Sequence, residues 1–189
     1  MYRLIYTIIL LFIFVSLVTD SEAKVLLNKD QALKIAFSDA QEIKEEQVFL
    51  TDKQVEEIKL YAKVPVESRL YVFYRGIKNN KTVSYALIDT HKLRTTTETL
   101  MFIINPDGSI KNIEIMAFYE PMDYMPTDRW IDLFNGKKLN NSLSIGKDIP
   151  NITGATITSN SLTTEVRKVL AVFKFGVRHD NDIREGEEN

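Results

Sequence analysis

The stretch that decides the fold runs from Glu98 to Phe118 and reads E-T-L-M-F-I-I-N-P-D-G-S-I-K-N-I-E-I-M-A-F. Two apolar segments, 98–104 and 110–118, flank Asn105-Pro106-Asp107-Gly108. Proline presets one turn torsion and glycine accepts a positive φ, so this tetrapeptide is typical of a turn between antiparallel strands. We therefore expect a β-hairpin over these residues.

Upstream of the hairpin, the sequence predicts two more strands and two helices. Arg69 to Tyr74 and Thr82 to Asp89 are rich in β-branched and aromatic residues and are separated by a turn at 76–80. The four strands would form an antiparallel meander. Asn28 to Gln31 and Thr51 to Gln54 resemble capping boxes ahead of apolar residues at helical spacing. These patterns predict helices over about 30–42 and 52–62.

Downstream of the hairpin, Thr127 can cap a short helix that carries Trp130, and 137–155 is expected to be mainly loop. Ser159 is expected to open a last helix, whose apolar stripe runs from Leu162 to Phe173. Helices at both ends of one antiparallel sheet define the α+β class. We expect a single domain over 24–177 and a disordered polar tail over 178–189.

The first 23 residues resemble an export signal. Arg3 gives a positive start, and the uncharged run Leu4 to Val18 is shorter than the about 20 residues of a membrane-spanning helix. Ser21-Glu22-Ala23 offers a cleavage site before Lys24. The alternative is an uncleaved segment that holds the protein at the inner membrane. Both alternatives place the remainder in the periplasm or elsewhere outside the cytoplasm.

Composition excludes several classes of protein. The 189 residues contain no cysteine, which rules out disulfides, thiolate zinc sites, iron–sulfur clusters and attached haem. His91 and His179 are the only histidines, so a histidine-rich metal centre is excluded, and we expect no metal site. The net charge of −2 gives no reason to expect nucleic acid as a partner.

The stretch that carries chemistry is Asn151 to Ser161, N-I-T-G-A-T-I-T-S-N-S, which precedes the last helix. Gly154 permits a close backbone approach, and four hydroxyl side chains cluster around it, those of Thr153, Thr156, Thr158 and Ser159. Free N–H groups at a helix N-terminus attract phosphate. The alternative is that these residues simply cap the helix, because serine and threonine are good caps.

Thr153 to Ser159 resembles the S/T-G-A-T-x-T/S signature of the FMN-binding domain family, which includes periplasmic subunits of two membrane electron-transport complexes. The resemblance implies that FMN is the cofactor. It also implies that Thr156 carries FMN through a phosphoester bond, installed by an extracytoplasmic flavin transferase. Thr153, Gly154, Ala155, Thr158 and Ser159 would surround the phosphate.

The resemblance extends over 99–173 and includes one departure. The hairpin, Glu120 just after it and the W-x-x-x-F-x-G segment 130–136 follow one another in the family's order. The resemblance therefore implies that Glu120 contacts the cofactor, although it could instead cap a turn. Flavinylated members have an aspartate six residues before the modified threonine, where this chain has Pro150, with Asp148 nearby.

Among the other candidates, Trp130, Tyr119 and Tyr124 could wall a flavin ring, while Trp130 could equally be core. His91 is expected to be an ordinary surface histidine.

The sequence thus predicts an exported FMN-binding electron-transfer protein, an electron carrier rather than a stand-alone enzyme. Its partners would be the flavin transferase and a redox protein, either a membrane electron-transport complex or a cytochrome. One alternative is a periplasmic flavin-dependent reductase, although no G-x-G-x-x-G nicotinamide motif is present. Another is a binding or scaffold module that kept the fold without the flavin.

Overall fold

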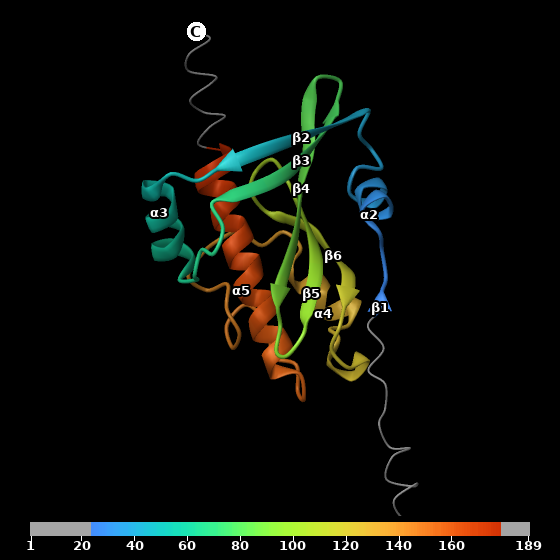
Figure 1. Ribbon diagram of the computed structural model, residues 1–189, viewed down its shortest axis with the longest axis vertical. Coiled ribbons are helices and arrows are strands. Elements are labelled where there is room, and N and C mark those ends of the chain that lie inside the picture. The colour runs from blue at the N-terminus through green and yellow to red at the C-terminus, as the bar shows by residue number, and fades with distance from the viewer. Residues whose placement is uncertain (1–23, 179–189) are drawn as a thin grey trace, which may run out of the picture.

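The computed structural model describes residues 24–178, which form one six-stranded antiparallel sheet with helices on both sides (Figure 1). The strands lie in the order β1-β6-β5-β4-β3-β2, which confirms the α+β class. Their bounds are β1 (Lys24–Val25), β2 (Glu42–Phe49), β3 (Leu70–Lys78), β4 (Lys81–Lys92), β5 (Thr97–Ile104) and β6 (Ile110–Phe118). The α-helices are α2 (Lys29–Ala36), α3 (Asp52–Ala62), α4 (Asp128–Ile131) and α5 (Thr156–Val172). Two short 3₁₀ helices, η1 (Met122–Tyr124) and η2 (Asp132–Phe134), flank α4, and the π-helix η3 (Phe173–Arg178) continues α5.

The predicted hairpin is confirmed as β5 and β6. The Asn105 N–H donates to the Ser109 carbonyl at 2.8 Å, and the Gly108 N–H donates to the Asn105 carbonyl at 2.9 Å. Gly108 has a φ of 82°, a conformation in which a side chain would be strained. The proline and glycine of the turn therefore set the register between β5 and β6.

The N-terminal region differs from the prediction. The first helix has the expected capping box between Asn28 and Gln31 but ends at Ala36. Residues 42–49, whose first residue was assigned to this helix, form β2, which pairs with β3 at the edge of the sheet. Charged side chains are common on an exposed edge, where they discourage pairing with other chains, and they conceal the alternation of a strand. The second helix, α3, has the predicted bounds and the predicted Thr51–Gln54 box.

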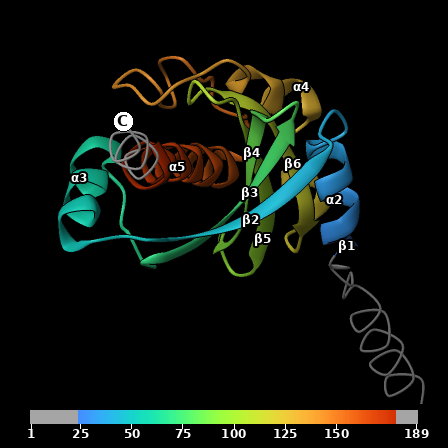
Figure 2. The same ribbon diagram turned by 90° about the horizontal axis from the view of Figure 1, so that it is seen from above.

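The sheet separates two cores because neighbouring side chains along a strand point to opposite faces. Leu100 and Phe102 of β5 pack on one face with α3, α4 and α5, while Met101 and Ile103 pack on the other with α2. Figure 2 shows α5 and α2 on the two sides of the sheet. The helix α5 therefore lies directly against the central strands, and its N-terminus meets one end of the sheet.

The last helix begins at Thr156, three residues earlier than predicted, so the hydroxyl-rich segment includes its first turn. No helix within residues 24–178 is both long and apolar enough to cross a membrane. The expected signal segment, 1–23, lies outside the described residues. So does the expected tail, apart from Arg178, which ends η3.

Candidate functional site

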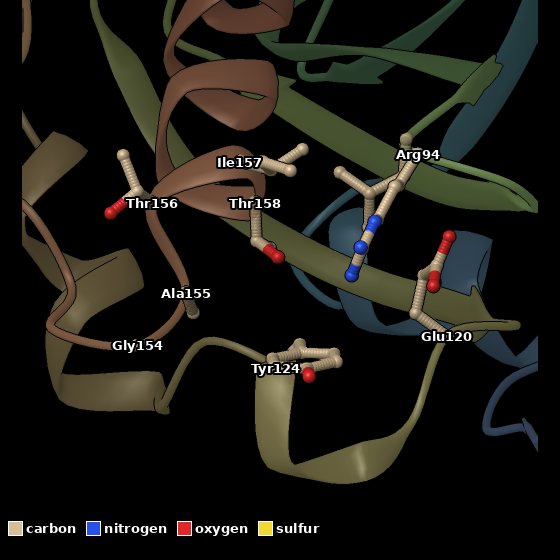
Figure 3. Close-up of a pocket in the computed structure, with 9 residues that line it drawn as sticks. Arg94, Glu120, Tyr124, Gly154, Ala155, Thr156, Ile157 and Thr158 are labelled. Carbon is tan, nitrogen blue, oxygen red and sulfur yellow. The ribbon is translucent and has the colours of Figure 1, made fainter.

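A cavity of about 250 Å³ lies where the N-terminus of α5 meets two loops (Figure 3). One loop is the β4–β5 turn, and the other follows β6 and includes η1. The lining residues are Leu93, Arg94, Glu120, Tyr124, Gly154, Ala155, Thr156, Ile157 and Thr158. Binding pockets for organic ligands usually enclose about 300–1,000 Å³, so this cavity suits part of a ligand rather than the whole of a large one.

Most of the predicted site residues meet here. Gly154, Ala155, Thr156, Thr158 and Glu120 all line the cavity, although 34 residues separate Glu120 from Gly154 along the chain. The other two do not line it. Thr153 is exposed and Ser159 is fully buried, where its hydroxyl donates to Asn151 Oδ1 at 2.6 Å. Ser159 therefore stabilises the loop and does not face the cavity.

The N-terminus of α5 is open. Asn28, Thr51 and Thr127 cap the helices α2, α3 and α4 with their side chains, whereas Ala155 at the start of α5 has no such group. Within residues 24–178, no acceptor is found for the N–H groups of 156–158, and the first turn carries no acidic residue. Unpaired N–H groups and the helix dipole favour an anion at this position.

Gly154 shapes the approach to this helix. Its φ is +84°, and a Cβ placed on it would meet no atom within 4 Å. The glycine is therefore required by backbone conformation and not by crowding. Its left-handed turn brings the chain into α5 with the first N–H groups uncovered.

Asn151 positions Thr156 and was missed as a site residue. Its Nδ2 donates to Thr156 Oγ1 at 3.0 Å, while its Oδ1 accepts from Ser159. Because the Thr156 oxygen accepts this hydrogen bond, its own proton stays available for transfer. In Figure 3 the Thr156 side chain points away from Arg94 and Glu120, whereas Thr158 points toward them. The only sequence signal for Asn151 was its place just before the hydroxyl cluster.

Glu120 anchors the β4–β5 turn. Its Oε1 accepts from the Thr95 N–H at 2.9 Å, the Thr96 N–H at 3.1 Å and the Thr95 hydroxyl at 3.2 Å. Burial would raise the pKa of this carboxyl, but the hydrogen bonds outweigh burial and hold the pKa below its usual value. Glu120 thus caps a turn, which was the alternative considered for it. The turn that it caps lies far from Glu120 in the sequence.

Arg94 is the main residue that sequence reasoning missed. It lies on the anchored turn, and its guanidinium points into the cavity, toward Thr158 and Tyr124 (Figure 3). Among residues 24–178 it has no ion-pair partner closer than 4 Å, unlike Arg69 and Arg75, which are paired with acids. No local pattern identifies Arg94, because only the fold brings this turn to α5.

Part of the chain matches a known protein family. Residues 95–171, which include Glu120 and the whole T-G-A-T segment but not Leu93 and Arg94, match the FMN-binding domain family. This segment is an FMN-binding domain. The match indicates that the cofactor is FMN. Strands β1 to β4 and helices α2 and α3 lie outside the match.

No curated protein sequence matches the chain. Among solved structures, the crystal structure of Shewanella oneidensis NqrC is similar, with 14% sequence identity and a TM-score of 0.44, over 80% of this chain and 85% of that one.

The residues present fit FMN. The open α5 N-terminus offers N–H groups to a phosphate, and the adjoining cavity has apolar and aromatic walls in Leu93, Ile157 and Tyr124 for a flat ring. Arg94 adds a cation to the lining of the cavity. Trp130, the other aromatic candidate, lies in the core and donates from Nε1 to the Pro150 carbonyl at 2.8 Å. Tyr119 does not line the cavity of the FMN-binding domain either.

Pro150 and Asp148 have structural partners in this FMN-binding domain. The Pro150 carbonyl accepts from Trp130, and Asp148 Oδ2 accepts from the Ser142 hydroxyl at 2.8 Å. Asp148 therefore stabilises the preceding loop and has no hydrogen bond to Thr156 among the described residues.

His91 differs from its prediction as a surface residue. It is 8% exposed and lies on β4 opposite Glu98 of β5, with Nε2 2.8 Å from Glu98 Oε1. Burial lowers the pKa of the imidazole, but Asp89 and Glu98 outweigh burial and raise the pKa to about 9. The spacing Asp89-x-His91 was an available signal, since residues two apart on a strand share a face.

Proposed function

We propose that this protein is an exported electron carrier, with FMN attached to Thr156 by a phosphoester bond. The observation that carries the proposal is the cavity of the FMN-binding domain, formed by the T-G-A-T segment at an uncapped helix N-terminus. Bound FMN would supply reversible one- or two-electron chemistry. The residues of this chain would fix its position and set the charge around it.

The phosphate end would lie at the start of α5. The N–H groups of 156–158 and the helix dipole favour the phosphate charge there. Forming the phosphoester joins Thr156 Oγ1 to phosphorus, with the overall loss of one water. The hydrogen bond from Asn151 supports this role, because it holds the Thr156 oxygen in place without using its proton.

The ring end would occupy the cavity on the far side of the first helical turn. Tyr124 and Ile157 offer apolar surface, and Arg94 offers a cation that has no ion-pair partner in the described part of the chain. A cation beside a flavin stabilises the negative charge that the ring gains on reduction. Arg94 would therefore favour the reduced flavin, and Glu120 would act on the flavin only through the turn that carries Arg94.

Export supports the covalent link, because a flavin lost outside the cytoplasm is not recovered. The charge and apolar pattern of residues 1–23 support export, with or without cleavage after Ala23. The partners would be an extracytoplasmic flavin transferase for attachment and a redox protein for electron exchange. That redox protein would be a membrane electron-transport complex or a cytochrome.

The proposal is tested with the full chain made without a flavin transferase. Titration with FMN, followed by quenching of flavin fluorescence, should show one saturable site. Riboflavin should bind more weakly, because it lacks the phosphate that the helix N-terminus holds. Equal affinity for the two flavins would refute the phosphate assignment, and the absence of binding to either would refute the carrier function.

A further inference from the structure

A buried cluster of charged side chains lies beneath the flavin cavity, between the sheet and α5. It consists of Asp89 and His91 on β4, Glu98 on β5, and Glu165 and Lys168 on α5. Glu165 follows Thr158 by seven residues, which is two helical turns or about 10 Å. The cluster is therefore separate from the cavity, and the proposed function leaves it without a role.

The imidazole of His91 is arranged like that of a metal ligand. Its Nε2 lies 2.8 Å from Oε1 of Glu98, a fully buried carboxylate. A neutral ring that donates from Nε2 presents a lone pair at Nδ1. Nδ1 is buried, makes no hydrogen bond within residues 24–178 and lies 3.4 Å from Asp89 Oδ2. Histidines that bind metals commonly donate their other ring nitrogen to a carboxylate in this way.

Two carboxylate oxygens lie close to the ring. One ligand atom each from Asp89, His91 and Glu165 all lie within 4.8 Å of one another. One imidazole nitrogen and two carboxylate oxygens suit zinc and neighbouring divalent metals. Asp89 and His91 lie on β4, and Glu165 lies on α5. Because these two elements pack against each other in the core, their positions do not depend on the conformation of a loop.

The net charge of the cluster also favours the binding of a cation. The carboxylates of Asp89, Glu98 and Glu165 outnumber the two cations that they face, the imidazolium of His91 and the ammonium of Lys168. An excess of buried negative charge is unfavourable. A divalent ion that takes the place of the ring proton would remove this excess.

We propose that Asp89, His91 and Glu165 bind one divalent transition-metal ion of the zinc class, with Glu98 orienting the imidazole. Lys168 pairs with Glu165, and its Nζ lies 3.4 Å from Asp89 Oδ2, so it competes with the ion. Its flexible stem allows the ammonium to move aside when the ion binds. The ion would join α5 to β4 directly below the flavin cavity.

The test is a calorimetric titration of the full chain with ZnCl₂ after treatment with EDTA, carried out without flavin. We expect one Zn²⁺ per chain. Loss of a residue that only orients a metal ligand weakens metal binding by about 10–100-fold. His91→Gln removes a ligand itself, so it should weaken Zn²⁺ binding by at least this factor. The matched control is His179→Gln, which removes the other histidine and should leave affinity unchanged. Circular dichroism of each variant establishes that it is folded.

Lys168→Met separates a metal site from a purely structural ion network. Removal of the competing ammonium should strengthen Zn²⁺ binding, whereas a structural network predicts no binding in either protein. The inference is overturned if the wild-type chain shows no saturable binding at millimolar Zn²⁺. It is equally overturned if His91→Gln binds as tightly as the wild type. Because no flavin is present, the result does not depend on the proposed function.

Discussion

Glu120 is the residue whose replacement tests the architecture of the site most sharply. Its carboxylate accepts three hydrogen bonds from Thr95 and Thr96 and so fixes the turn that carries Arg94. Hydrogen bonds to a charged group contribute about 1.5–3 kcal/mol in net terms. Glu120→Gln keeps one oxygen acceptor and should lower the free energy of unfolding by about 1–2 kcal/mol. Glu120→Ala removes every acceptor and should lower it by about 2–4 kcal/mol.

The pH dependence of this effect follows from the direction of the pKa shift. The pKa of Glu120 is lower in the folded chain than its usual value of 4.5, so the ionised form stabilises the fold. This stabilisation is fully present above about pH 4.5 and is lost as pH falls through the folded pKa. The difference between wild type and Glu120→Gln should therefore be constant from about pH 5.5 to 8 and shrink in more acidic solution.

Urea denaturation of both proteins at pH 7 and near pH 3.5 measures this difference. Asp123→Asn is the matched control, because it removes one exposed carboxylate from the same loop and should change stability by less than about 0.5 kcal/mol. Equal stability of Glu120→Gln and wild type at pH 7 would refute the anchoring role. A difference that grows in acid would refute the direction of the pKa shift.

Three further predictions concern the helix, its approach and the ring end of the site. Arg167 donates to the carbonyls of Tyr61, Ala62, Asn140 and Leu143. Arg167→Met should therefore lower the free energy of unfolding in urea by about 2–4 kcal/mol, and a loss under about 1 kcal/mol would contradict this. Gly154→Ala forces a side chain onto a φ of +84° and should destabilise the protein by about 1–2 kcal/mol in the same assay; unchanged stability would show that the loop can rearrange. Arg94→Gln should weaken FMN and riboflavin binding by a similar factor of about 10, because the arginine lies at the ring end; a loss confined to FMN would place it at the phosphate instead.

The parts of the fold that could be predicted are those where local chemistry and tertiary structure agree. The β5–β6 hairpin follows from apolar strands and a Pro-Asp-Gly turn, and α3 follows from its capping box. The strand β2 was missed because its sequence, E-I-K-E-E-Q-V-F, is dominated by charge. Residues 42–49 form a strand because they pair with β3, and this pairing depends on tertiary structure that the local sequence does not show. The two-residue strand β1 is too short for any periodic signal.

The site divides in the same way. The T-G-A-T segment is continuous in sequence, so its residues and the cofactor could be inferred from a local motif. Arg94, which lines the same cavity as the T-G-A-T segment, could not be inferred in this way, and neither could the anchoring role of Glu120. Both depend on a turn and a loop that the sheet brings together. Ser159 was assigned to the phosphate from the family resemblance, and the last helix was expected to begin at this residue. The earlier start at Thr156 places Ser159 inside the protein.

The measurement that tests the central claim most directly is the intact mass and visible spectrum of the full chain, produced in a periplasm that contains a flavin transferase. The account predicts a flavin absorption band and a mass increase of one FMN less one water. The mass increase should be absent in Thr156→Ala, and both signals should be retained in Thr153→Ala, whose side chain is exposed and does not line the cavity. An unmodified mass in a chain that still binds FMN would contradict the phosphoester. A colourless chain of unmodified mass, even with added FMN, would contradict the carrier function itself.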